Sequence, residues 1–198
     1  MNLTGWTLIE VVDVVAARRA LAGRMLRCPD CGAALAPWGH ANARTVHDLD
    51  GAKVNVRPDR ARCTSCAATH VLLVATLLAR RGYTVRVVGH ALVRAARGEL
   101  HREIADRLDA PVGTVRGWIR RARRSAHQLW TLGVAAVVAL DQDALPAGER
   151  SDPLAAALDV LAAAALAMRR RFGPAFGEPW PTITVLTRGR LLAPVSTG

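Results

Sequence analysis

Four cysteines in two pairs offer the clearest chemistry in the sequence. CPDC places Cys28 and Cys31 three positions apart, and CTSC does the same for Cys63 and Cys66. This spacing lets both thiolates of a pair face one ion, and two such pairs complete a tetrahedral site. We therefore predict one structural Zn²⁺ held by all four cysteines, with no position left open for a catalytic water.

Two other interpretations of the cysteines are open on the sequence alone. The four residues could be buried free thiols, or one pair could carry redox chemistry. His40, His47 and His70 lie within or beside the same segment and could replace a cysteine as ligand. Paired spacing at both sites favours the zinc interpretation.

The cysteines lie in a segment predicted to form a small β domain, residues 28–79. Polar and apolar side chains alternate on both sides of Asp50-Gly51, a dipeptide typical of a tight hairpin turn. We expect strands near residues 34–38, 44–49, 53–62 and 69–73. A metal ion would help to fold such a ribbon, because it is too small to bury a sufficient core of its own.

Helices are predicted on both sides of this domain. In residues 1–27, apolar residues at helical spacing favour one amphipathic helix over residues 8–22. Residues 80–130 contain three further runs at that spacing, the first of which ends at Gly98. The predicted fold class is therefore α+β: a small zinc-ribbon β domain, a three-helix unit and C-terminal helices.

The sequence HREIADRLDAPVGTVRGWIRRARR, residues 101–124, fits two helices joined by a turn at Asp109-Ala110-Pro111. Asp109 tolerates the left-handed conformation that such a turn needs, and Pro111 suits the first turn of the next helix. Ala105 is small enough to let the two helices cross closely. This is the pattern of a helix-turn-helix unit.

The second of these helices separates a packing face from an outer face. With residues spaced 100° apart, Val115, Trp118 and Ile119 point inwards, while small and cationic residues lie outside. Such an outer face suits the major groove of DNA. The residues predicted to contact DNA are Thr114, Arg116, Gly117, Arg120, Arg121 and Arg124. The plainer alternative is a solvated helical face.

The charge of the chain is concentrated in this region. The 198 residues include 27 basic and 16 acidic side chains, which gives a net charge of +11, and Lys53 is the one lysine. Between residues 80 and 124, twelve arginines stand against four acids. A local excess of this size favours a polyanionic partner, and double-stranded DNA is the partner we expect.

Residues 28–124 resemble the amino-terminal half of bacterial insertion-sequence transposases, in which a zinc ribbon precedes a helix-turn-helix. The likeness is carried by CPDCGAALAPWGHANARTVHDLDG, VRPDRARCTSC and EIADRLDAPVGTVRGWIRRAR. Stand-alone proteins with the same layout are also similar, including in the ending TRGRLLAP. The stretch GTVRGWIRRARR resembles the promoter-reading helix of sigma factors.

The resemblance implies a zinc-containing DNA-binding protein of transposase-like or regulatory type. In the transposases a catalytic domain with three metal-binding carboxylates follows. The segment after Trp130 places no carboxylate on a convincing strand, so we expect no enzyme activity from this chain. The alternatives are an accessory or truncated subunit of a DDE-type transposase acting with a partner chain, and a sigma-like transcription factor.

Residues 131–198 are predicted to form a C-terminal helical segment and a Pro- and Gly-rich tail. A linker at 143–153 should precede an Ala-rich helix that ends near Arg171, and TITVL in the tail has the composition of a strand. The apolar run 131–140 and the Ala-rich helix could pair two copies in a homodimer or cover the core of one chain. A cytoplasmic protein without membrane contact is expected, because no secretory signal or run of about 20 apolar residues is found.

Overall fold

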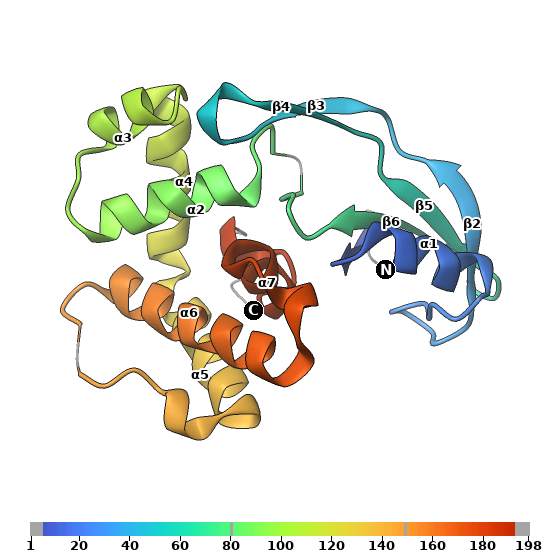
Figure 1. Ribbon diagram of the computed structural model, residues 1–198. Helices are drawn as coiled ribbons and strands as arrows, with labels where there is room; N and C mark the ends of the chain where they lie inside the picture. The colour runs from blue at the N-terminus through green and yellow to red at the C-terminus, as the bar shows by residue number, and fades with distance from the viewer. Residues whose placement is uncertain (1–5, 80, 149, 193–198) are drawn as a thin grey trace.

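The fold is α+β, with a sheet from the first part of the chain and helices from the rest (Figure 1). This computed structural model describes residues 6–79, 81–148 and 150–192. The last six residues of the predicted tail, 193–198, lie outside the described residues. The sheet and the helices occupy opposite ends of the molecule, and a long hairpin of β3 (Arg44–His47) and β4 (Lys53–Val56) joins them along one side (Figure 1).

A four-stranded sheet carries the cysteine segment, in the strand order β1-β6-β5-β2. Its strands are β1 (Trp6–Val11), β2 (Leu35–His40), β5 (Asp59–Cys63) and β6 (Thr69–Val74). β5 pairs antiparallel with β2 and β6, whereas β1 pairs parallel with β6. Helix α1 (Val14–Ala22) packs on one face of the sheet, where Leu21, Leu35 and Leu72 are buried together.

The single helix predicted over residues 8–22 is wrong. Residues 8–11 belong to β1, and the helix begins only at Val14. Asp13 marks the change, because its carboxylate accepts hydrogen bonds from the N–H groups of Val15 and Ala16 and so caps a new helix. The N-terminal segment is therefore part of the sheet, and the boundary predicted at residue 28 does not separate two units.

The strand predicted over residues 53–62 is divided in two. β4 ends at Val56 and β5 begins at Asp59, because Pro58 between them has no N–H for a strand ladder. The hairpin turn predicted at Asp50-Gly51 is confirmed. Both residues have positive φ, 58° and 73°, and the N–H of Ala52 donates to the carbonyl of Leu49, which closes a tight turn around them.

Three helices follow the sheet: α2 (Val85–Ala96), α3 (His101–Arg107) and α4 (Val112–Arg124). The turn between α3 and α4 falls where the sequence predicts it, and Asp109 has the expected left-handed backbone, with φ of 46°. Ala105 and Val115 are buried where α3 and α4 pack together. The sequence therefore defines this helix pair well.

The C-terminal part is helical, with α5 (Ala126–Leu140), α6 (Pro153–Phe172) and α7 (Pro179–Leu186), followed by the short 3₁₀ helix η4 (Arg190–Leu192). Asp152 caps α6 by accepting a hydrogen bond from the N–H of Leu154. The boundary predicted after residue 130 is wrong, because α5 runs through it. The strand predicted at TITVL is also wrong, since these residues lie in α7.

One hydrophobic core unites α2 to α7. Buried Leu92 and Trp118 belong to the same cluster as Leu154 and Leu161 of α6 and Leu191 of η4. The C-terminal helices therefore cover the core of their own chain, as one of the two interpretations expects. Among the helices in the described parts of the chain, none combines the length and the apolar composition that a membrane span requires.

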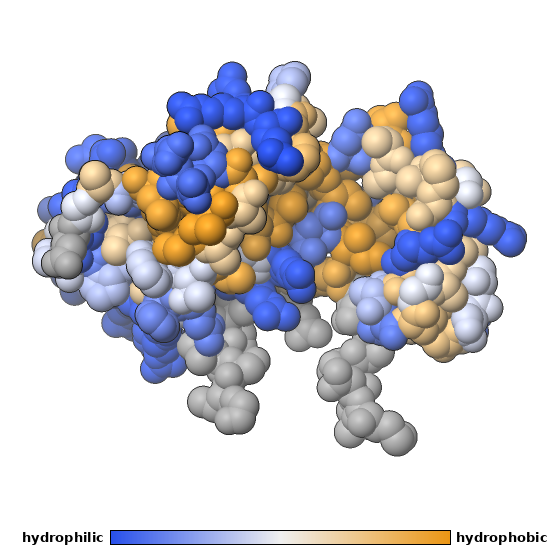
Figure 2. All heavy atoms as spheres, turned by 90° about the horizontal axis from the view of Figure 1, so that it is seen from below, coloured by the Kyte–Doolittle hydropathy of each residue, from blue (hydrophilic) through white to orange (hydrophobic). Residues whose placement is uncertain are grey.

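Helix α5 leaves part of its apolar surface uncovered. It contains no charged residue, and Trp130, Leu132 and Val138 are 40–52% exposed. Figure 2, which views the molecule from below, shows apolar side chains gathered on this side of the helical half. Pairing of two copies through this region stays a prediction.

The contact between Gly89 of α2 and Trp180 of α7 generates the first test. A Cβ added at Gly89 would lie 2.1 Å from the indole ring, so Gly89→Ala should force the ring out of place. We expect a loss of about 1–3 kcal/mol in the free energy of unfolding, measured by denaturant titration. Gly113→Ala is the matched control, because a Cβ there meets nothing within 4 Å. Equal stability of the two variants would contradict this packing.

Candidate metal centre and nucleic-acid interface

Two turns of nearly the same backbone form present the cysteines. In the first, the N–H of Cys28 donates to the carbonyl of Ala33, and in the second the N–H of Cys63 donates to that of Ala68. Gly32 and Ala67, which follow the two pairs, both have positive φ, 73° and 61°. Ala67 therefore adopts the conformation that Gly32 supplies in the first turn, although alanine rarely does so.

The four sulfur atoms converge at one end of the sheet. All four lie within 4.8 Å of one another. The Sγ atoms of Cys28 and Cys66 are 3.8 Å apart, and those of Cys31 and Cys63 are 3.4 Å apart. Cys28 and Cys63 are buried, while Cys31 and Cys66 are exposed, and none is in a disulfide. The predicted set of ligands is thus brought together as a metal site.

The electrostatics of the cluster favour a cation. The backbone N–H of Ser65, whose nitrogen lies 3.4 Å from Sγ of Cys63, is the largest influence that lowers the pKa of Cys63 to about 6. The N–H of Ala68 also lowers the pKa of Cys66, but the neighbouring thiols of Cys63 and Cys31 outweigh it and raise that pKa to about 12. One thiol ionises readily and then opposes ionisation of the next, a conflict that a bound cation would remove.

The three histidines named as possible ligands have different surroundings. Nε2 of His40 lies 3.2 Å from Oδ1 of Asp59, and the ring of His47 stacks on that of Tyr83. His70 is fully buried, with Nε2 3.4 Å from Sγ of Cys28. Of the three histidines, only His70 contacts the cluster. It does so at Cys28, which is itself one of the four predicted ligands.

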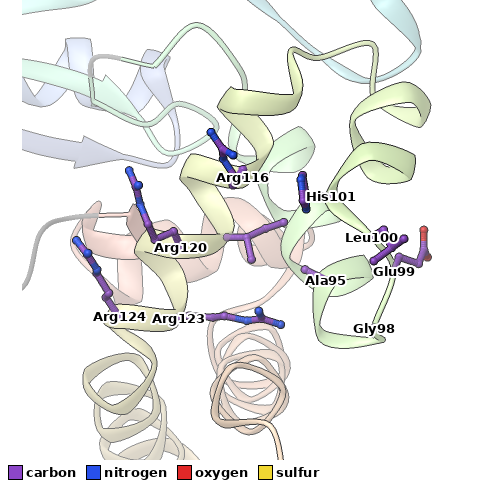
Figure 3. A pocket seen from close by; sticks show the side chains of 10 residues that line it. Ala95, Gly98, Glu99, Leu100, His101, Arg116, Arg120, Arg123 and Arg124 are labelled. Atoms are coloured by element: carbon purple, nitrogen blue, oxygen red, sulfur yellow. The ribbon is translucent and has the colours of Figure 1, made fainter.

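Helix α4 lines a groove of about 640 Å³ with the end of α2 and the start of α3. In Figure 3, Arg116, Arg120 and Arg124 extend from one side of α4, each one turn from the next. Arg123 points away from them and lies 3.7 Å from Asp152. The groove is therefore strongly cationic along α4, and its opposite wall is formed by Ala95, Gly98, Glu99, Leu100 and His101.

The six residues predicted to contact DNA fall into two sets. Arg116, Arg120 and Arg124 are exposed and line the groove. Gly117, predicted on the outer face, is buried because the guanidinium of Arg121 lies over it, with Nη1 3.1 Å from where a Cβ would be. Gly117 is thus unavailable as a contact, and Arg121 and Thr114 are only half exposed.

Sequence reasoning missed Arg81 and Arg123, which adjoin this surface. Burial lowers the pKa of Arg81, and the positive charge of Arg121 in α4 adds to this effect. Arg123 forms part of the groove wall. Helical spacing could have indicated Arg123, which follows Arg116 by seven residues and so lies on nearly the same face, but no sequence signal links Arg81 to α4.

The tip of the β3–β4 hairpin fixes the sheet to the helices. Oγ1 of Thr84, the residue that caps α2, donates a hydrogen bond of 2.7 Å to Asp48 and accepts one from the N–H of Val87. Beside it, the ring of Tyr83 stacks on His47 and meets the edge of Trp118 in α4. The cysteine half is therefore held against the same helix that carries the arginines.

Comparison with known proteins gives one partial match and no function. A family described as a domain of unknown function (DUF6431) matches residues 28–118. The similarity begins at the first cysteine and ends at Trp118 in α4, so it takes in the cluster, the hairpin and the α3–α4 turn. No curated protein and no solved structure matches the chain.

The hairpin anchor generates a second test. Asp48→Ala removes the acceptor for Thr84 and weakens the cap of α2, so we expect a loss of about 1 kcal/mol in the free energy of unfolding. Thermal or denaturant unfolding followed by circular dichroism would measure it. Asp106→Ala, at an exposed position of α3, should cost nothing. If both variants unfold alike, Asp48 is not an anchor.

Proposed function

We propose that this protein is a zinc-containing double-stranded DNA-binding protein in which α3 and α4 act as a helix-turn-helix. One observation carries the proposal: Arg116, Arg120 and Arg124 form a cationic row along α4. Among the described residues, no carboxylate forms an ion pair with any of these three arginines. Guanidinium groups that form no such ion pair are available to phosphate oxygens and to guanine bases.

The packing of α4 supports its entry into the major groove. Its inner side is fixed by buried Val115, Trp118 and Ala122, so the outer side is presented on a rigid helix. The start of α4 carries Gly113 and Thr114 and is slim, whereas the arginines gather towards its end. In this role the slim start reaches base edges, and the arginines contact guanine or the flanking phosphates.

Zinc is the metal that suits the cysteine cluster. Four thiolates around Zn²⁺ at about 2.3 Å from the metal stand about 3.8 Å apart in a tetrahedron. Two pairs of sulfurs, at 3.8 and 3.4 Å, are near this value. Soft thiolate ligands also select zinc over Mg²⁺ or Ca²⁺. With four protein ligands the ion would be structural, and the role we propose for the chain is binding, not catalysis.

The zinc proposal predicts about one zinc per chain in purified protein, measured by elemental analysis. Chelation should unfold the sheet of the cysteine half, because its small core lacks other support. Cys63→Ser should lower zinc content and stability together, whereas Ser65→Ala keeps the backbone N–H and should keep the metal. A folded sheet in protein shown to be free of metal would refute the proposal.

The DNA proposal predicts that Arg120→Ala with Arg124→Ala weakens binding to a mixed-sequence duplex without loss of fold. Because each arginine displaces counterions from DNA, the slope of log K against log salt should become shallower by up to about 2. Fluorescence anisotropy over a salt series measures both effects. Arg169→Ala with Arg171→Ala, at exposed positions of α6, is the matched control.

If both double variants lose the same affinity, binding depends only on the net charge of the protein, and α4 is not the binding face. Selection of bound duplexes from a random pool then tests specificity. If α4 reads bases, the wild type should enrich one sequence, and Arg120→Ala should relax the choice at one position of that sequence.

A further inference from the structure

The four-stranded sheet has a second face that α1 does not cover. Ala61 of β5 points into the α1 core, so its neighbours Arg60 and Arg62 point to the other side. Leu8 of β1 and Arg60 of β5 are both paired with Val71 of β6, and the three form one row across that side. Leu8 is 40% exposed there.

This face is hollowed into a groove of about 440 Å³. Its floor is apolar, formed by Leu8, Val71 and Leu73. Arg60 and Arg44, with Asn42, supply polar groups along its sides. The groove therefore combines an apolar base with hydrogen-bond donors of positive charge.

An exposed aromatic ring adjoins the groove. Trp38 of β2 is 48% exposed, and the guanidinium carbon of Arg62 lies 4.6 Å from the centre of its ring. Arg62 and Arg60 are two residues apart on β5 and share a face, so the ring stands beside the groove. Arg62 lies against the indole, and because almost half of Trp38 is exposed, part of the ring is accessible to a stacking base.

Cationic groups predominate near the groove. Ala79 lines it, and two residues further along the chain burial and the charge of Arg121 lower the pKa of Arg81. One acid belongs to the same face: burial raises the pKa of Glu10, and the nearby charges of Arg188 and Arg190 oppose that rise. The positive charges of these two arginines offset the negative charge of Glu10, so the net charge of this surface stays positive.

We propose that this open face of the sheet binds a single-stranded polynucleotide, with an unpaired base stacked on Trp38 and phosphates held by Arg44, Arg60 and Arg62. A duplex presents mainly phosphates to a sheet and cannot place bases on an apolar floor. An unpaired strand offers both bases and phosphates, which is the combination that single-strand binding surfaces recognise. The site is separate from the α4 groove and does not require the duplex binding proposed above.

The test compares three labelled probes by fluorescence anisotropy: a duplex, the same duplex with a single-stranded extension, and that single strand alone, as DNA and as RNA. The extension should tighten binding to the wild type, and Trp38→Ala should reduce affinity for the extended duplex and the single strand by about fivefold or more. Affinity for the plain duplex should not change. Trp130→Ala, which removes a comparably exposed tryptophan from α5, should match the wild type.

Two checks keep a folding defect apart from a binding defect. The metal content and circular dichroism of Trp38→Ala should equal those of the wild type, and Trp38→Phe, which keeps an aromatic ring, should recover most of the lost affinity. If single strands bind but the duplex does not, the helix-turn-helix proposal fails while this one stands. If the extension adds no affinity to the wild type, or if Trp38→Phe binds no better than Trp38→Ala, the proposal is overturned. Tighter binding to DNA or to RNA would show which of the two polynucleotides this face recognises.

Discussion

The approach of four thiols to one point is the constraint on which the rest of the structure depends. The core behind α1 is small, and two of its buried members, Cys28 and Cys63, are themselves part of the cluster. The same two cysteines therefore serve both as members of the apolar core and as members of the thiol cluster. A bound cation would relieve the mutual opposition of the thiols to ionisation and stabilise the sheet at once.

A small number of side-chain contacts connect the cysteine half to the helices. Asp48 meets the cap of α2 at Thr84, and the rings of His47, Tyr83 and Trp118 follow one another into α4. Trp118 is also part of the large core that extends to α6 and α7. The arginine face of α4 is therefore positioned from two sides, by the hairpin tip and by the C-terminal helices.

Local signals predicted the parts of the fold that depend on neighbours in the chain. The cysteine pairs, the Asp50-Gly51 turn and the left-handed Asp109 each require a particular residue type at one position. The errors came from contacts distant in sequence. Residues 8–11 form a strand because β6 offers them a parallel edge, and TITVL is helical although β-branched, because Pro179 begins a helix that packs on Gly89 of α2.

Within the candidate site, helical spacing correctly separated Val115 and Trp118 from Arg116, Arg120 and Arg124. It failed at Gly117, since a wheel of Cα positions does not show that the long side chain of Arg121 folds back over the glycine. The sheet face around Trp38 could not be predicted from the sequence either, because it is formed by strands that are far apart in the chain and meet only in the folded sheet. Strand alternation gave the orientation of Arg60 and Arg62 only once the neighbouring strand was known.

Thr84 bonds both to the hairpin tip and to the start of α2, and this limits how the two halves of the protein can be recombined. If the chain were cut between β6 and α2, the hairpin tip would lose its contact with Thr84, and the start of α2 would lose its contact with Asp48. Neither half is therefore structurally independent of the other. A chimera that brings a different ribbon to these helices must bring a loop that presents an acceptor to Thr84, so the two halves should be exchanged, and should diverge, as a pair.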